Sequence, residues 1–171
     1  MADSRDHHAT IFVAPEVAGP SEAARHACDP DMAARIAAHV TVAYPHEAPI
    51  SDLLVERVRE ASRNIRPFRL RLGSLGCLEG PEGGVYVNVE DLDGGCRKMR
   101  DEVLRPPFHD IGYPPHVTLI HPQTSRRGRE FWDSGFYQGR GQDFTVGEVT
   151  ITGFDGGKWV VLMTYPLTYR R

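Results

Sequence analysis

Two short stretches of this 171-residue chain each carry the triplet His-Val-Thr. The first reads HVTVAYP from position 39 and the second HVTLIHP from position 116, so the first three residues are identical and proline recurs at the seventh. One His-x-Thr can arise by chance in a chain with eight histidines, but two copies with matched flanks are hard to explain by composition. His39, Thr41, His116 and Thr118 are therefore the candidate catalytic residues.

The spacing within each motif indicates what these residues could do. Residues i and i+2 of a β-strand project from the same face, so each histidine and its threonine would point to one side while the intervening aliphatic residues face a core. A phosphodiester needs a base for the attacking oxygen, an acid for the leaving oxygen and donors for the non-bridging oxygens. Two imidazoles, whose ordinary pKa lies near 6.5, and two hydroxyls supply that set without a metal or a cofactor.

The surrounding pattern predicts the elements that position the motifs. Each motif follows a helical segment and lies on a short β-branched run closed by proline, as expected for two half-domains related by a pseudo-twofold axis within one domain, residues 1–171. Residues His7 and His8 read as part of a solvent-exposed polar tail. We expect strands at 10–13, 39–43, around 68–72 and 85–89, and at 116–120, a loop at 80–84, helices in 21–38 (two pieces), 51–65 and 93–104, and a hairpin formed by 144–154 and 159–165.

Composition and charge exclude several classes of protein. Twenty Lys and Arg against 23 Asp and Glu give a net charge of −3, which provides no general attraction for long DNA or RNA. Three cysteines without paired spacing argue against a disulfide framework, and no signal peptide or apolar run long enough for a membrane span is present. A cytoplasmic monomer acting on a small nucleotide or an RNA end is predicted.

Other residues near the motifs are candidates for binding the substrate. Tyr44 could stack on a base or ribose, or close its strand against the core. Tyr86 lies on the polar face of a neighbouring predicted strand, which could line a cleft or face solvent. Arg126 follows the second motif and could grip a phosphate, or belong to a solvated loop. His46 and His121 raise the possibility of zinc, but strand periodicity places His121 on the face opposite His116, and no zinc-ligand motif is present.

The chain resembles the two-histidine phosphoesterase superfamily, which includes 2′-5′ RNA ligase-like proteins and cyclic nucleotide phosphodiesterases. The matching residues are 39–42 and 116–119, and the order of elements matches from Thr10 to Pro166. The resemblance implies a bilobal, duplicated α+β fold with two antiparallel sheets and flanking helices around a central cleft, metal-free phosphoester chemistry, and both His/Thr pairs as catalytic residues. Many relatives carry Phe-Leu-Gly where this chain has Tyr44, Pro45 and His46, which leaves the substrate open.

Three functions are compatible with these features. The first is an enzyme that hydrolyses a cyclic phosphate or a 2′-5′-linked nucleotide by acid-base catalysis between the two histidines. The second is a nucleotide- or RNA-binding module that uses the same cleft without turnover, although the intact histidines and threonines favour an enzyme. The third is 2′-5′ RNA ligase activity or the trimming of RNA ends, against which the mild negative charge argues.

Overall fold

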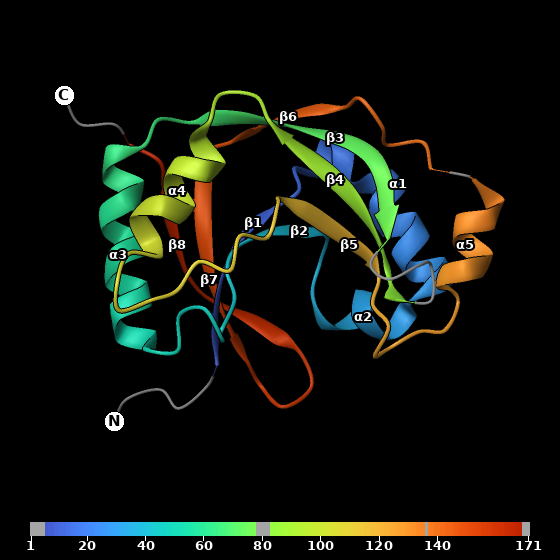
Figure 1. Ribbon diagram of the computed structural model, residues 1–171, viewed down its shortest axis with the longest axis horizontal. Helices are drawn as coiled ribbons and strands as arrows, with labels where there is room; N and C mark the ends of the chain where they lie inside the picture. Colours follow the sequence, from blue (N-terminus) through green and yellow to red (C-terminus); the bar gives the residue numbers. More distant parts are fainter. Residues whose placement is uncertain (1–5, 78–82, 136, 169–171) are drawn as a thin grey trace.

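The computed structural model describes residues 6–77, 83–135 and 137–168. Its strands form one curled antiparallel sheet (Figure 1), in the order β6-β3-β4-β5-β2-β1-β7-β8. The strands are β1 (His7–Phe12), β2 (His39–Ala43), β3 (Phe68–Cys77), β4 (Val85–Asp91), β5 (His116–Ile120), β6 (Asp143–Val146), β7 (Glu148–Phe154) and β8 (Trp159–Pro166).

The two predicted sheets are in fact one, which corrects the expected arrangement. The junction lies between the two motif strands, where β2 pairs with β5 through Val40 and Val117. We call β2, β1, β7 and β8 the first half-sheet, and β5, β4, β3 and β6 the second half-sheet. The pairing of apolar residues at the centre of both motif strands allows a single sheet to run through the site, and it brings the two motifs next to each other.

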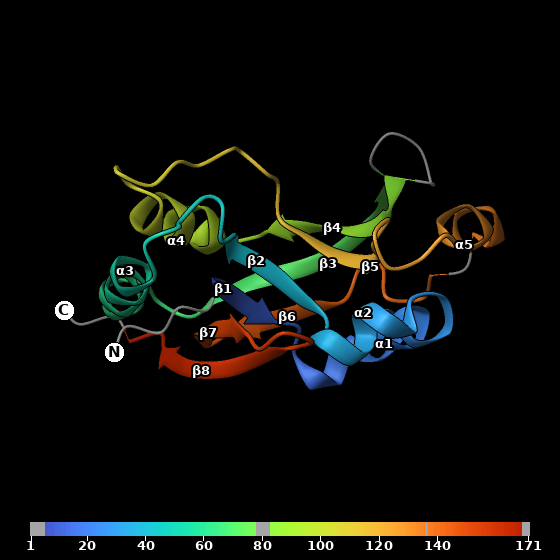
Figure 2. The ribbon, with the colours of Figure 1, turned by 90° about the horizontal axis from the view of Figure 1, so that it is seen from below.

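The curl of the sheet follows from a break at Gly147. The predicted single run 144–154 divides there into β6, which pairs with β3, and β7, which pairs with β1. Six strand spacings separate β6 from β7 in the sheet order, about 29 Å if the sheet were flat. A connection of one residue spans at most about 7 Å, so the sheet must bend until its ends approach each other (Figure 2).

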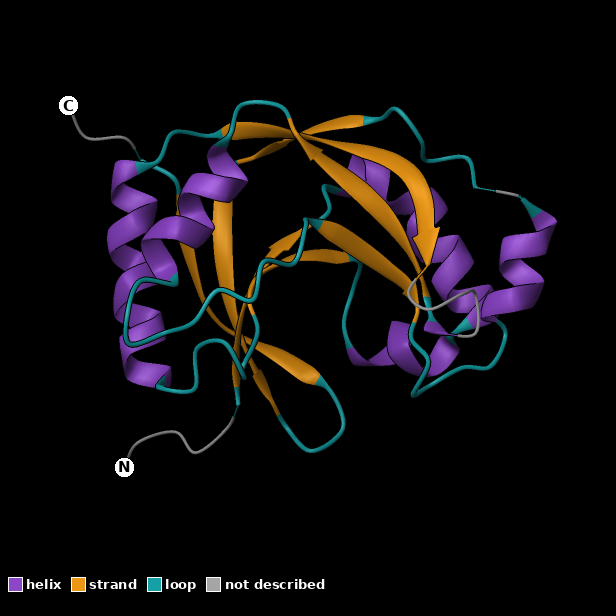
Figure 3. Cartoon of the chain, viewed as in Figure 1, coloured by secondary structure: helices purple, strands orange, loops and turns teal. Residues whose placement is uncertain are grey.

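Helices flank the curled sheet at two opposite sides of the molecule (Figure 3). The helices are α1 (Pro15–Cys28), α2 (Pro30–Arg35), α3 (Ser51–Asn64), α4 (Gly95–Val103) and α5 (Gly128–Ser134). α3 packs on β1, β7 and β8 and α4 on β2, β3 and β4, while α1 packs on α2 and β5. Each motif strand is therefore backed by a helix that precedes the other motif strand in the chain.

Most predicted elements are confirmed, with two further differences near the N-terminal end. Two helices occupy the predicted 21–38 segment, but α1 begins at Pro15, where proline is tolerated in the first turn. β1 begins at His7 rather than Thr10, so His7 and His8, predicted to be exposed, are 5% and 6% exposed. Of the predicted loop 80–84, residues 80–82 lie outside the described residues. No helix in the described part of the chain has the length and apolar character needed to cross a membrane.

Candidate active site

Both motif strands present alternating faces, as predicted. The aliphatic residues Val40, Val42, Val117 and Leu119 are fully buried in the core, whereas the histidine and threonine of each motif are half-buried. This identical pattern follows from the two-residue period of a strand with one face on the core. The polar residues of both motifs consequently lie on the same, inner face of the sheet.

The strand register sets the relative positions of the four polar residues. Because β2 and β5 are antiparallel with Val40 opposite Val117, His39 comes opposite Thr118 and Thr41 opposite His116. The two histidines are then diagonal neighbours, and diagonal residues in an antiparallel pair are about 7–8 Å apart. A phosphoryl group placed between them would have an imidazole on each of two sides and a hydroxyl at each remaining corner.

Each imidazole is oriented by a backbone carbonyl two residues earlier in the chain. His39 Nδ1 lies 2.8 Å from the Ala37 oxygen, and His116 Nδ1 lies 2.8 Å from the Pro114 oxygen. A carbonyl only accepts, so each Nδ1 carries the hydrogen and Nε2 of each neutral ring carries a lone pair. Burial lowers the pKa of His39 to about 4, and it also lowers the pKa of His116, against the opposing effect of the carbonyl bond. Both imidazoles are thus neutral at pH 7 in the free protein.

A third histidine, His8 of β1, contacts the first motif. Its Nε2 lies 3.0 Å from Thr41 Oγ1, and its ring meets the ring of His39 edge-on at 5.3 Å. Burial lowers the pKa of His8 well below its ordinary value, and the nearby His39 lowers it further. His8 is therefore a neutral hydrogen-bond partner that holds the Thr41 hydroxyl in place.

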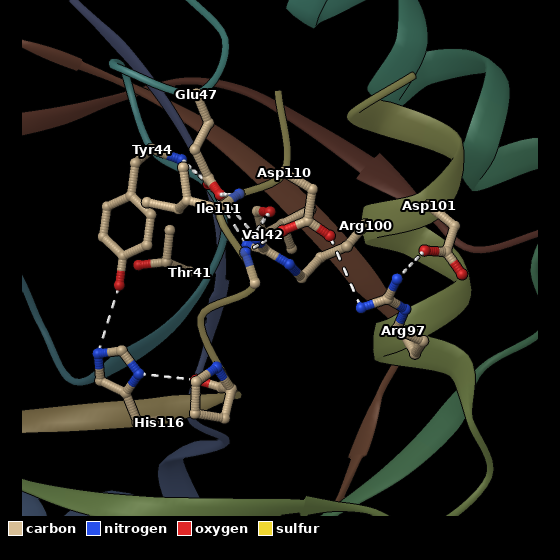
Figure 4. Close-up of polar contacts among 12 residues, drawn as sticks. Thr41, Val42, Tyr44, Glu47, Arg97, Arg100, Asp101, Asp110, Ile111 and His116 are labelled. Carbon is tan, nitrogen blue, oxygen red and sulfur yellow. Dashed lines mark hydrogen bonds and ion pairs between the residues drawn. The ribbon is translucent and has the colours of Figure 1, made fainter. Parts of the chain in front are cut away.

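Tyr44, the first residue after β2, connects the two motifs. Its hydroxyl lies 3.3 Å from His116 Nε2 (Figure 4), and its pKa is raised by burial and lowered to a smaller extent by a hydrogen bond with the Thr41 side chain. Its ring stacks on the imidazoles of His8 and His46, at 5.7 and 5.3 Å between centroids. The ring therefore packs against protein side chains, and the stacking of a base on it stays a prediction.

A buried ion-pair network anchors the first motif from behind. Arg100 of α4 donates to the Val42 carbonyl at 2.9 Å, to Glu47 Oε1 at 2.7 Å and to Asp110 Oδ1 at 2.5 Å (Figure 4). Glu47, which is 1% exposed, also accepts from the Tyr44 backbone N–H at 3.1 Å. The network fixes β2, the turn after it and the loop leading into β5 relative to one another.

The second motif has a comparable anchor supplied by the other half of the chain. Arg25 of α1 donates to the Thr118 carbonyl at 2.9 Å and to carbonyls of Met32 and Ile36. Asp29, at the start of α2, accepts from the His121 backbone N–H at 2.8 Å and so holds the turn after β5. Each motif strand is therefore tied to a buried arginine on the helix behind it.

A pocket of about 560 Å³ opens beside the second motif and has the size of a small-molecule site. His116 and Thr118 contribute to its wall, together with aromatic side chains and a rim from the turn after β5. Among the described residues its lining includes no lysine or arginine. The lining includes Tyr44, His46, Tyr86, Tyr113, Gly84, His121, Pro122 and Gln123.

Comparison with known proteins identifies the family. Residues 13–158 match the family model described as the 2′-5′ RNA ligase superfamily. The chain belongs to the 2′-5′ RNA ligase superfamily. This membership confirms the resemblance inferred from the two motifs. No curated protein matches the chain in sequence.

Solved structures with the same fold are distant in sequence. The crystal structure of E. coli LigT complexed with NADP+ has 18% identity and a TM-score of 0.64, covering 98% of this chain and 99% of LigT. The protein TT0787 of Thermus thermophilus has 18% identity and a TM-score of 0.63, with 96% and 99% covered. A crystal structure of a phosphoesterase has 17% identity, a TM-score of 0.65, and 96% and 99% covered. These likenesses show that this superfamily member shares the LigT fold.

The remaining predicted residues of this superfamily member differ in position. Tyr86 pairs with Thr118 across β4 and β5, and its ring lies 5.2 Å from that of His116 in the pocket wall. Arg126 is exposed in the loop after β5 and is not among the pocket-lining residues described. His121 does line the pocket, contrary to the strand-period expectation, because β5 ends at Ile120 and the chain turns. Within the described ranges no group of three or more His, Cys, Asp or Glu is arranged for a metal.

The sequence reading missed His8, Arg25 and Arg100. The sequence did hold an indication for His8. If the predicted strand at 10–13 is extended by two residues, His8 lies on the same face as Thr10. Arg100 occupies a helical stripe with Cys96, Met99 and Val103, all buried in α4. The stripe could have indicated a buried arginine, but its carboxylate partners come from distant segments that no local pattern brings together.

Proposed function

We propose that this member of the superfamily is a metal-independent phosphodiesterase that opens a nucleoside cyclic phosphate or cleaves a 2′-5′-linked nucleotide. The observation that carries the proposal is the placement of both His/Thr pairs on one face of adjacent antiparallel strands, in a register that puts the imidazoles on one diagonal. The pocket beside His116 would hold the nucleoside.

The side chains of the two motifs account for every proton transfer of the proposed reaction. One neutral imidazole takes a proton from water through Nε2 as the water oxygen bonds to phosphorus. The bond from phosphorus to the leaving ribose oxygen breaks, and that oxygen receives a proton from the other imidazole in its charged form. Thr41 and Thr118 donate to the non-bridging oxygens, where the negative charge accumulates. The product is a phosphomonoester, and the imidazoles end with exchanged protonation states.

The low pKa values of the free protein fit this scheme. Burial keeps both imidazoles neutral in the empty cleft, but a bound phosphate anion favours the protonated form of whichever histidine faces the leaving oxygen. Binding of the substrate would then bring a proton with it. The neutral lining of the pocket favours a ligand with one phosphate charge over a polyphosphate.

The test is turnover of a substrate panel in EDTA. Purified protein is incubated with 2′,3′-cyclic nucleotides and 2′-5′ dinucleotides, and products are separated by chromatography. The wild type is expected to form phosphomonoesters or nucleosides, His39→Ala and His116→Ala to lose turnover, and His26→Ala, at an exposed histidine of α1, to retain it. Equal turnover by the wild type and both active-site variants contradicts the proposal, as does nucleotide binding with no product.

The same assay addresses ligation, which the superfamily name includes. If the attacking oxygen is a 5′-hydroxyl of a second nucleoside instead of water, the same base and acid form a 2′-5′ bond from the cyclic phosphate. Adding an oligonucleotide with a free 5′-hydroxyl to the cyclic substrate tests this route. A joined product that depends on both histidines would assign ligation to the same site.

A further inference from the structure

The hydroxyl of Tyr44 contacts one side chain of each motif, at the edge of the position proposed for the phosphate. It lies 3.3 Å from His116 Nε2 and interacts with Thr41. We propose that Tyr44 is a further catalytic residue: its hydroxyl bonds His116 in the free protein and turns to a non-bridging phosphate oxygen when substrate binds. This inference rests on the proposed phosphodiesterase function, and it adds a third hydroxyl donor to Thr41 and Thr118.

The position of this hydroxyl is fixed from both ends of the residue. The ring is packed against three protein rings, because His8 and His46 stack on it and Tyr113 meets it edge-on at 5.4 Å. At the backbone, the N–H of Tyr44 donates to Glu47, which is itself held by Arg100. A donor held in this way needs little reorganisation when charge develops on a phosphate oxygen, which is the condition for effective electrostatic catalysis.

The protonation states determine which way the hydrogen bond runs. His116 Nδ1 carries a hydrogen directed at the Pro114 carbonyl, so Nε2 of the neutral ring has a lone pair. Burial raises the pKa of Tyr44, so its phenol stays protonated near neutral pH. The O–H group then donates a hydrogen bond to that lone pair. This bond stabilises the neutral form of His116.

Protonation of His116 reverses this arrangement. Once Nε2 carries a hydrogen it can no longer accept, and the Tyr44 hydrogen becomes available to another acceptor. In the proposed reaction the acceptor is a non-bridging oxygen of the phosphate next to His116. The hydroxyl therefore responds to the protonation state of the imidazole, without itself losing a proton at any step.

The decisive variant is Tyr44→Phe, which keeps the ring and its stacking and removes only the hydroxyl. Its control is Tyr165→Phe, in which the lost hydroxyl bonds Met163 on β8, outside the pocket. With a substrate that the wild type turns over, kcat of Tyr44→Phe is expected to fall about 10- to 100-fold, since one of three donors is lost, and KM to change less. Unchanged or increased kcat overturns the proposal, the latter because it would mean that the hydroxyl obstructs the site.

A second readout separates this proposal from the proposed function. NMR of the histidine rings measures the pKa of His116, which is expected to rise in Tyr44→Phe because the neutral form loses its hydrogen bond. Titration with inorganic phosphate is expected to show about tenfold weaker binding in the same variant. If the wild type turns over none of the substrates, the proposed function fails, and these two values decide the placement of Tyr44. An unchanged His116 pKa together with unchanged phosphate affinity overturns it.

Discussion

The two half-sheets carry the same candidate catalytic residues but differ in what surrounds them. In each, an imidazole bonds a carbonyl two residues back and a buried arginine binds the strand from behind. In the first half-sheet, His8 and Tyr44 fill the space next to the motif. In the second, the pocket lies next to the motif, with Tyr86 in its wall and Tyr44 and His46 lining it from the turn after β2. Under the proposed function, the two halves would share the proton transfers, whereas the pocket that would hold the nucleoside lies beside the second motif.

The expected equivalence of the two histidines is tested by removing each imidazole in turn. His39→Ala and His116→Ala are each expected to lower kcat by about 10²- to 10⁴-fold, because each removes one proton-transfer group. Steady-state kinetics in EDTA measures both losses, with His26→Ala as the control. A variant of one half that keeps nearly full kcat would mean that the halves are not chemically equivalent.

The arginines behind the strands are expected to differ in their contribution to stability. Arg100→Met leaves Glu47 buried without its cation and is expected to lower the free energy of unfolding by about 3–5 kcal/mol. Arg25→Met mainly leaves neutral carbonyls unpaired and is expected to cost about 1–3 kcal/mol.

Urea denaturation measures both values, with Arg69→Met as a control. Arg69 forms its ion pair with Asp93 at the exposed surface, so its replacement is expected to have no measurable effect. A larger loss for Arg25→Met than for Arg100→Met would contradict the greater cost expected for leaving the Glu47 carboxylate buried without its cation.

Recognition by the second half-sheet is tested at Gly76 on β3. A Cβ built on Gly76 would lie 2.5 Å from the Tyr86 ring, so Gly76→Ala must displace that ring from the pocket wall. We expect KM to rise about tenfold, equivalent to a stacking contact of about 1.4 kcal/mol, with kcat little changed. Gly157→Ala, where a Cβ meets nothing within 4 Å, is the control. A loss confined to kcat would place Tyr86 in the chemistry instead of in binding.

A further prediction concerns the pH dependence of stability in the first half-sheet. Neutral His39, with a pKa of about 4, and His8, with a lowered pKa, would both be charged in the unfolded chain below about pH 6.5. Between these values the unfolded chain binds more protons, so the free energy of unfolding falls as pH falls from 6.5 towards 4.

Urea denaturation at pH 7 and pH 5 measures this loss of stability. His8→Phe keeps a ring in place of the imidazole and removes one contribution, so its loss between the two pH values is expected to be smaller than that of the wild type. Greater stability of the wild type at pH 5 than at pH 7 would be inconsistent with neutral, buried imidazoles.

The sequence was sufficient to predict the structural features that depend on local periodicity and residue type. The motif strands, their polar faces and the amphipathic helix α4 follow from alternation and helical spacing. Features that depend on distant partners were not predictable in this way. The break at Gly147 looks like the interior of one apolar run, and only the pairing of β6 with β3 and of β7 with β1 reveals it.

The same distinction between local patterns and distant partners applies to the candidate site. The four motif residues were identified because they repeat, and repetition is visible in one sequence. The burial of His8 depends on β1 lying between β2 and β7, and the contact of Tyr44 with His116 depends on the register of β2 and β5. Neither is encoded within a few residues of the side chain concerned.

The most direct test of the central claim is a titration of histidine-labelled protein with inorganic phosphate, followed by NMR at the ring nitrogens. His39→Gln and His116→Gln assign the two signals. Nε2 of His39 and of His116 should shift together with a single dissociation constant, and His39→Gln should weaken the response of His116. A response from only one of the two rings, or two separate dissociation constants, would contradict a phosphate held between them.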